Sequence, residues 1–149
     1  EMSYATGKDM RHAFCRHAYD PHNVCELIYA NYEERVGFHD GKYELRSGIE
    51  VYWVGGHTRG LQIVRVHTQR GWIVLASDAA HYLENLVNRS PFPIVTDTSD
   101  MLNAYELIES LAESHQHIIP GHDPLVMNSY SRTGPDHLEI VSLSKPPLP

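Results

Sequence analysis

Three polar residues of the sequence each follow an apolar run. His57 comes after IEVYWVGG, Asp78 after WIVLAS and His122 after HIIPG. Two imidazoles and a carboxylate form a ligand set that suits zinc, manganese or iron. Their spacings of 21 and 44 residues match no local ligand motif. A structural interpretation therefore stays open for each residue: a turn for His57 and His122, and a helix cap for Asp78.

Each of these residues stands where a predicted strand ends. In layered α/β folds, such positions are held by a rigid sheet and open onto a crevice. Hydrophobic alternation, turn signals and caps predict an α/β domain with the following elements: strands over 49–53, 61–68, 72–77 and 117–119, a hairpin turn at 69–71, a helix over about 21–34 capped by Asp20, and a helix capped by Thr98, Ser99 or Asp100 that runs to about Ala112.

The composition limits the classes of function. The 149 residues with 42% hydrophobic content fit one ordinary globular domain. A formal net charge of −7 argues against a nucleic-acid partner, and no apolar run approaches the roughly 20 residues that span a bilayer. Cys15 and Cys25 lie outside any CxxC pattern, which indicates reduced thiols and a cytoplasmic protein. The eleven histidines point to metals or proton transfer.

Three segments resemble one known family in their order and spacing. GGHTRGLQ, VLASDAAHYLEN and HIIPGHDPLV are similar to the metal-binding loops of the metallo-β-lactamase superfamily, within it the N-acyl-homoserine lactonase branch. The resemblance covers about residues 1–130. It implies an αββα sandwich with a mixed sheet and flanking helices, of which this chain would be the C-terminal half. It also implies two divalent metal ions, zinc first, with manganese or iron open.

The resemblance assigns roles to the three polar residues. It implies that His57 binds the first metal, that Asp78 bridges both and that His122 binds the second. The glycines around His57 would then let the backbone turn sharply, so that the ring points inward at a metal.

The HxHxDH stretch that the family uses for further ligands is absent from this sequence. In the family it lies upstream, so we expect residues 1–149 to be a partial domain whose upstream half is outside this chain. His12, His17 and His22 do not reproduce that spacing. A decayed, non-catalytic homologue is the other explanation. Residues 145–149 are expected to form a disordered tail.

The resemblance implies a hydrolase that opens the lactone ring of N-acyl-homoserine lactones with a metal-activated water. His81 stands where the family often places a tyrosine, and we expect it to serve as the general acid for the leaving group, with Asp78 as the other catalytic residue. An exposed helix residue is the alternative for His81. Tyr82 and Phe92 are predicted substrate contacts, although core packing is a common fate for a residue such as Phe92.

Two other functions stay open. A thioesterase of the glyoxalase II kind shares the metal loops, but the short stretch after His122 leaves little room for an added substrate domain, which favours the lactonase. A non-catalytic module would hold metal weakly, because three ligands divided between two ions give each ion only two protein bonds. Such a module should also expose sheet surface and depend on a partner. The sequence leaves a homodimer open.

Overall fold

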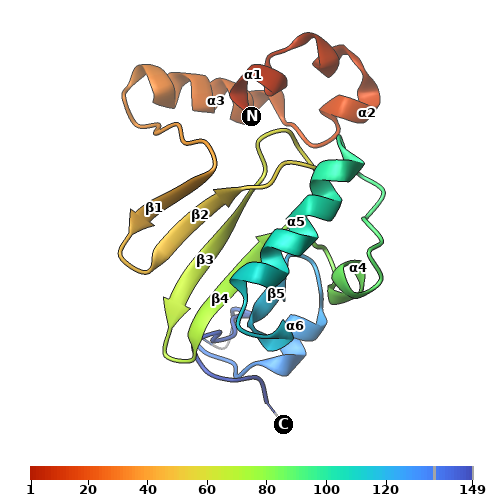
Figure 1. Cartoon of the computed structure of the whole chain (residues 1–149). Helices are drawn as coiled ribbons and strands as arrows, with labels where there is room; N and C mark the ends of the chain where they lie inside the picture. Colours follow the sequence, from red (N-terminus) through yellow and green to blue (C-terminus); the bar gives the residue numbers. More distant parts are fainter. Residues whose placement is uncertain (136, 149) are drawn as a thin grey trace.

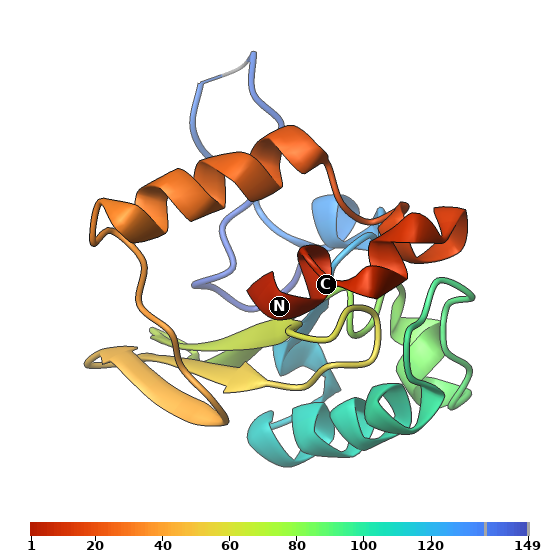
Figure 2. The same ribbon diagram turned by 90° about the horizontal axis from the view of Figure 1, so that it is seen from above.

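The computed structural model describes residues 1–135 and 137–148. A five-stranded mixed sheet forms its centre, with α5 along one face, and α3 lies above the end of the sheet in the view of Figure 1 (Figures 1 and 2). The α/β class predicted from the sequence is confirmed. The elements in chain order are α1 (Met2–Ala5), a 3-10 turn η1 (Lys8–Arg11), α2 (Ala13–Arg16), α3 (Pro21–Tyr32), β1 (Lys42–Arg46), β2 (Ile49–Trp53), β3 (Gln62–Thr68), β4 (Gly71–Ser77), α4 (Leu83–Val87), α5 (Thr98–Leu111), η2 (His115–His117), β5 (Ile118–Pro120) and α6 (Leu125–Ser129).

The strand directions explain why residues far apart in sequence meet at one edge of the sheet. The strands lie in the order β1-β2-β3-β4-β5, with antiparallel pairing from β1 to β4 and parallel pairing between β4 and β5. Strands β2, β4 and β5 therefore point the same way. Since each of them is followed by one of the polar residues singled out in the sequence, their carboxyl ends bring these residues to a common edge.

One face of the sheet packs against α5 to form the core. Ile63 of β3, Val74 of β4 and Tyr105 of α5 are fully buried members of this cluster. The N-cap of α5 lies one residue before the first predicted cap, Thr98. It is Asp97, whose carboxylate accepts hydrogen bonds from the backbone N–H groups of Ser99 and Asp100. This packing holds β4 rigid up to the point where it ends at the site.

The opposite face of the sheet is also apolar. The register places Val51, Val64, Leu75 and Ile119 in one row across β2, β3, β4 and β5. The first three of these side chains are only half-buried, whereas Ile119 is buried. In β4, Ile73 and Val74 are buried on opposite faces of the sheet, whereas Leu75 is half-buried. An apolar row of this kind is typical of a sheet face that packs on a further layer.

An ion-pair network around the buried Glu50 supports the β1–β2–β3 part of the sheet. Glu50 is buried, and its carboxylate accepts a hydrogen bond from the Tyr52 hydroxyl at 2.7 Å. It also pairs with the ammonium of Lys42 at 2.6 Å and the guanidinium of Arg65 at 3.3 Å. The hydrogen bond from Lys42 is the largest cause that lowers the pKa of Glu50 from 4.5 to about 2.

A Glu50→Gln variant should unfold more easily at pH 7 by about 2 kcal/mol, because a neutral amide cannot replace a carboxylate that serves three donors. Since the pKa of Glu50 is lowered by folding, its charge stabilises the protein above pH 4.5, and this contribution is lost as the pH falls toward about 2. Urea unfolding at several pH values should show the difference shrinking over that window. The exposed Glu26→Gln is the control, and a difference that does not depend on pH would contradict the assignment.

The two ends of the chain are held by hydrogen bonds. Helix α3 begins as predicted, with the carboxylate of Asp20 accepting a hydrogen bond from the His22 N–H. At the other end, Leu148 donates its backbone N–H to the carbonyl of Ser129, while Pro149 of the predicted tail lies outside the described residues. No helix in the described part of the chain is long and apolar enough to cross a membrane.

Two boundaries near the site differ from the sequence prediction. The final strand is β5 at 118–120 and not 117–119, because His117 ends the 3-10 turn η2. Helix α4 starts at Leu83, after Tyr82 at its N-cap, so Asp78 lies in the turn before the helix and does not cap it. Asp78 is thereby left free to point its carboxylate across the sheet edge.

Candidate metal centre

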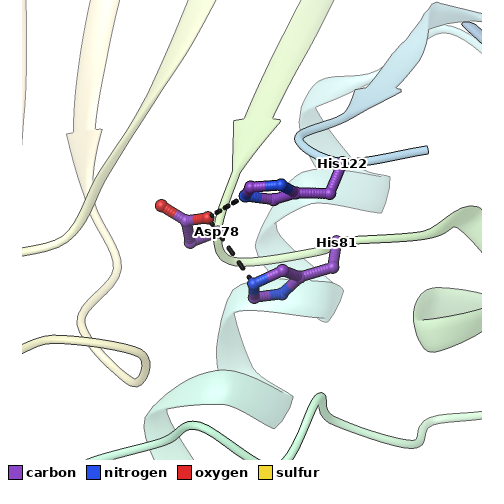
Figure 3. Close-up of side chains that lie close together, drawn as sticks. All are labelled: Asp78, His81 and His122. Carbon is purple, nitrogen blue, oxygen red and sulfur yellow. Dashed lines mark hydrogen bonds and ion pairs between the residues drawn. The ribbon is translucent and has the colours of Figure 1, made fainter. Parts of the chain in front are cut away.

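Asp78, His81 and His122 converge at the carboxyl ends of β4 and β5 (Figure 3). His122 donates its Nε2 hydrogen to Asp78 Oδ1 at 2.8 Å, and His81 Nε2 lies 3.6 Å from the same oxygen. The ligand atoms of all three residues lie within 4.8 Å of one another. One oxygen of the Asp78 carboxylate thus faces both imidazoles, as Figure 3 shows, in a cluster formed entirely by this chain.

The backbone around Asp78 and His122 explains this convergence. Ser77 ends β4 with φ +48°, a left-handed conformation that turns the chain abruptly before Asp78. Gly121 crosses directly against it, since a Cβ at Gly121 would lie 2.5 Å from the Ser77 carbonyl oxygen. Only a residue without a side chain allows the two loops to approach this closely.

His81 is the most buried member of the cluster. Its side chain is 8% exposed, against 58% for His122 and 33% for Asp78. The ring is stacked between those of Phe92 at 4.2 Å and His122 at 4.8 Å. Burial is the main cause that lowers the pKa of His81 from 6.5, while Asp78 opposes this shift. The ring is therefore neutral at pH 7, which is the form that binds metals.

The chemistry of this donor set fits a divalent cation. Nε2 of His81 and Nε2 of His122 both face Asp78 Oδ1, so two ring nitrogens and one carboxylate oxygen, donors that zinc accepts, lie together. Zinc–nitrogen bonds of about 2.0 Å place tetrahedral ligand atoms about 3.3 Å apart. Small side-chain movements would bring the three ligand atoms from their present separations, all within 4.8 Å, to that spacing.

His57 lies next to this cluster on the loop after β2. Its ring meets that of His81 edge-on, with centroids 5.4 Å apart. His57 Nδ1 lies 2.8 Å from the carbonyl oxygen of Ile94, to which it donates a hydrogen bond. Metal-binding histidines commonly donate one ring N–H to a carbonyl in this way, which leaves the lone pair of the other nitrogen available. His57 stays a predicted ligand on this ground.

The glycines before His57 allow its loop to pack tightly. Gly56 has φ +86°, and a Cβ there would lie 2.6 Å from the Met101 side chain at the start of α5. The Gly56 carbonyl accepts hydrogen bonds from the backbone N–H groups of Thr96 and Asp97 and from the Thr96 hydroxyl. The loop is thereby fixed to the segment that carries Ile94, which in turn fixes the ring of His57.

The two predicted substrate contacts take different positions. Phe92 stacks on His81 and so covers one side of the cluster. Tyr82 stands at the N-cap of α4, 39% exposed. A cavity of about 260 Å³ opens on the His57 side, and its apolar lining includes Phe14, Tyr19 and Ile94.

His81 was not among the metal ligands predicted from the sequence. The pattern that could have identified it is its spacing from Asp78, because two residues three apart in a turn bring their side chains onto the same side. Asp123, next to His122, has the sequence signature of a turn residue before Pro124, and no local pattern shows that its carboxylate is buried.

The fold is similar to that of one known structural class. The structure matches part of metallo-β-lactamase-fold chains, which confirms the predicted resemblance at the level of structure. No protein-family model and no curated protein matches the sequence.

The solved structures that match include several lactonases. A quorum-quenching N-acyl homoserine lactone lactonase superposes with a TM-score of 0.54 and 25% identity, over 60% of this chain and 38% of its own. An AiiA variant from B. thuringiensis with N-decanoyl-L-homoserine at its active site gives 0.56 and 24%, over 62% and 37%. AidC, a dizinc quorum-quenching lactonase in complex with a product, gives 0.55 and 17%, over 82% and 45%. This chain thus spans less than half the length of each neighbour.

Proposed function

We propose that this chain forms part of a metal-dependent hydrolase and that the hydrolase opens the lactone ring of N-acyl-homoserine lactones. The observation that carries the proposal is the convergence of Asp78, His81 and His122 at one sheet edge, with His57 beside them. The similarity to an N-acyl homoserine lactone lactonase supports the choice of substrate.

In this proposal Asp78, His57 and His122 would hold two divalent ions, zinc first, with manganese or iron as alternatives. Asp78 would be a ligand of both ions, His57 of one and His122 of the other. Bound divalent ions supply the Lewis acidity that ester hydrolysis at neutral pH requires. His57 keeps its proton on Nδ1 and donates a hydrogen bond from it to the Ile94 carbonyl, so that Nε2 offers its lone pair. His122 must release the Nε2 proton that it now donates to Asp78.

For His81 the structure favours a ligand role. A general acid at this position would need a charged ring, whereas burial lowers the pKa of His81 and keeps the ring neutral at pH 7. Its Nε2 already faces Asp78 at 3.6 Å. We therefore propose that His81 gives the cluster a third ligand, which lets this chain hold one ion with three protein bonds, as zinc sites normally require.

The substrate would lie over the exposed side of the cluster. Phe92 covers His81 and can exclude water from the reacting ester. The adjoining cavity of about 260 Å³ offers aromatic and aliphatic surface, including Phe14 and Ile94, for an acyl chain. Tyr82 is exposed and can contact the lactone from α4.

The full-length protein should hydrolyse N-hexanoyl-L-homoserine lactone, followed by the appearance of the ring-opened acid. A His122→Ala variant should lose on the order of 100-fold or more in kcat/KM, because a ligand is removed. Hydroxyacylglutathione is the comparison substrate: turnover of the thioester alone would establish the glyoxalase II alternative. Zinc binding without turnover of either substrate would establish a non-catalytic module.

Two further features of the proposal rest on the sequence. A cytoplasmic location is supported by two cysteines without a pairing pattern. A homodimer is compatible with the half-buried apolar row on the sheet face opposite α5.

A further inference from the structure

We propose that Asp123 is a positioning residue whose carboxylate holds the His122 loop against the loop of Asp78 and His81. Its consequence for metal affinity rests on the metal site proposed above, whereas its effect on the loops can be measured without metal.

The carboxylate of Asp123 joins two separate elements. Asp123 is buried, with 8% of its surface exposed. Its Oδ2 accepts a hydrogen bond from the Leu83 N–H at 3.2 Å, and its Oδ1 accepts one from the Leu125 N–H at 2.9 Å. Leu83 and Leu125 are the first residues of α4 and α6. One buried carboxylate thus accepts hydrogen bonds from the first N–H group of two short helices, whose N-cap residues are Tyr82 and Pro124.

Between these helices and the sheet edge, the two site loops are joined by backbone hydrogen bonds. Gly121 donates its N–H to the Ala80 carbonyl at 2.9 Å, and His122 donates its N–H to the His81 carbonyl at 2.9 Å. The bond from the Leu83 N–H to Asp123 comes next, one residue after His122 and two residues after His81, and here the donor is on the other segment. The series therefore ends in a charged acceptor, and hydrogen bonds to a charged group are stronger than those between neutral groups.

This arrangement acts directly on the ligand geometry. His81 and His122 are stacked with centroids 4.8 Å apart, and both face Asp78 Oδ1. If the Asp123 link is lost, the loops keep the two backbone bonds, the close contact at Gly121 and the hydrogen bond from the His122 ring to Asp78. The His122 side chain is 58% exposed, so packing around its ring cannot replace the lost constraint.

The first measurement is amide hydrogen exchange in metal-free Asp123→Ala. The N–H groups of Gly121 and His122 should exchange about tenfold faster, because two hydrogen bonds to a charged acceptor next to them are lost. Asp123→Asn should show a smaller change, since its amide oxygen still accepts one bond. The control is Asp20→Ala, which removes the cap of α3 but no bond between the site loops.

The second measurement is zinc affinity by equilibrium dialysis. Asp123→Ala should bind zinc about tenfold or more weakly, as is usual when a residue that orients ligands is removed, and Asp20→Ala should bind like the unsubstituted chain. With cobalt in place of zinc, the visible absorption bands of Asp123→Ala should shift, because they report ligand geometry and not fold stability.

The outcomes separate this inference from the proposed function. Unchanged exchange at Gly121 and His122 in Asp123→Ala would overturn the positioning role, whatever the metal affinity. If exchange quickens as expected but the unsubstituted chain binds no zinc, the positioning role stands and the metal site fails. If both Asp123→Ala and Asp20→Ala accelerate exchange across the whole sheet, Asp123 is a general stability residue and the inference is wrong.

Discussion

An Asp78→Asn variant should bind zinc on the order of 100-fold more weakly than the unsubstituted chain while keeping its fold. Asp78 is the only carboxylate of the cluster, and both His81 Nε2 and His122 Nε2 face its Oδ1. The amide that replaces it has nearly the same shape, so packing is preserved, but it carries no negative charge to offset a divalent cation. Equilibrium dialysis with metal analysis measures the affinity and the stoichiometry together.

The control for this substitution is Asp97→Asn. Asp97 also accepts hydrogen bonds through its carboxylate, in this case from two backbone N–H groups of its own helix, so the variant tests loss of a charge at a cap. It should change the free energy of unfolding by less than about 1 kcal/mol, because Asn caps helices about as well as Asp, and it should leave zinc binding intact. Equal zinc affinity in Asp78→Asn and the unsubstituted chain would remove Asp78 from the metal centre.

A Gly121→Ala variant should be destabilised by about 3 kcal/mol or more and should lose zinc binding with it. A Cβ at this position would lie 2.5 Å from the carbonyl oxygen and 2.7 Å from the carbonyl carbon of Ser77. Both are backbone atoms, so no side-chain rotation relieves the clash, and the ends of β4 and β5 must separate. Urea unfolding and zinc dialysis on the same preparation report both effects.

Gly41→Ala provides the comparison for this second substitution. Gly41 has φ +68°, yet a Cβ there would meet no atom within 4 Å. Its cost is therefore limited to the left-handed conformation, about 1 kcal/mol, and zinc binding should persist. A Gly121→Ala chain as stable as Gly41→Ala would show that the loops of Asp78 and His122 are not in tight contact.

The strands that carry the site could be predicted because their periodicity is local. Alternation in IEVYW and the apolar run WIVLAS depend only on neighbouring residues, and the order of the three loop segments pointed to the family. That His57, Asp78 and His122 follow strands pointing the same way needed the pairing of β4 with β5, which no local pattern encodes.

The position of His81 beside Asp78 and His122, on which its proposed ligand role rests, could not be predicted for a different reason. A histidine in DAAHYLEN can be exposed on a helix or buried in a turn, and the choice depends on where the helix starts. The structure starts α4 at Leu83, which leaves His81 in the turn between the rings of Phe92 and His122. Helix boundaries are the least certain part of a sequence prediction, because capping competes with tertiary contacts.

The single parallel pair of the sheet also bears on how the molecule reaches its native state. Strands β1 to β4 follow one another in a meander whose connections are short, whereas β5 must return to β4 across the segment that contains α4 and α5. The entropy lost in closing a chain segment grows with its length, so nearby pairings form sooner than distant ones. The imidazole of His122 therefore joins its partners only when β5 docks, and a bound cation would slow the unfolding of that last-formed part more than of the meander.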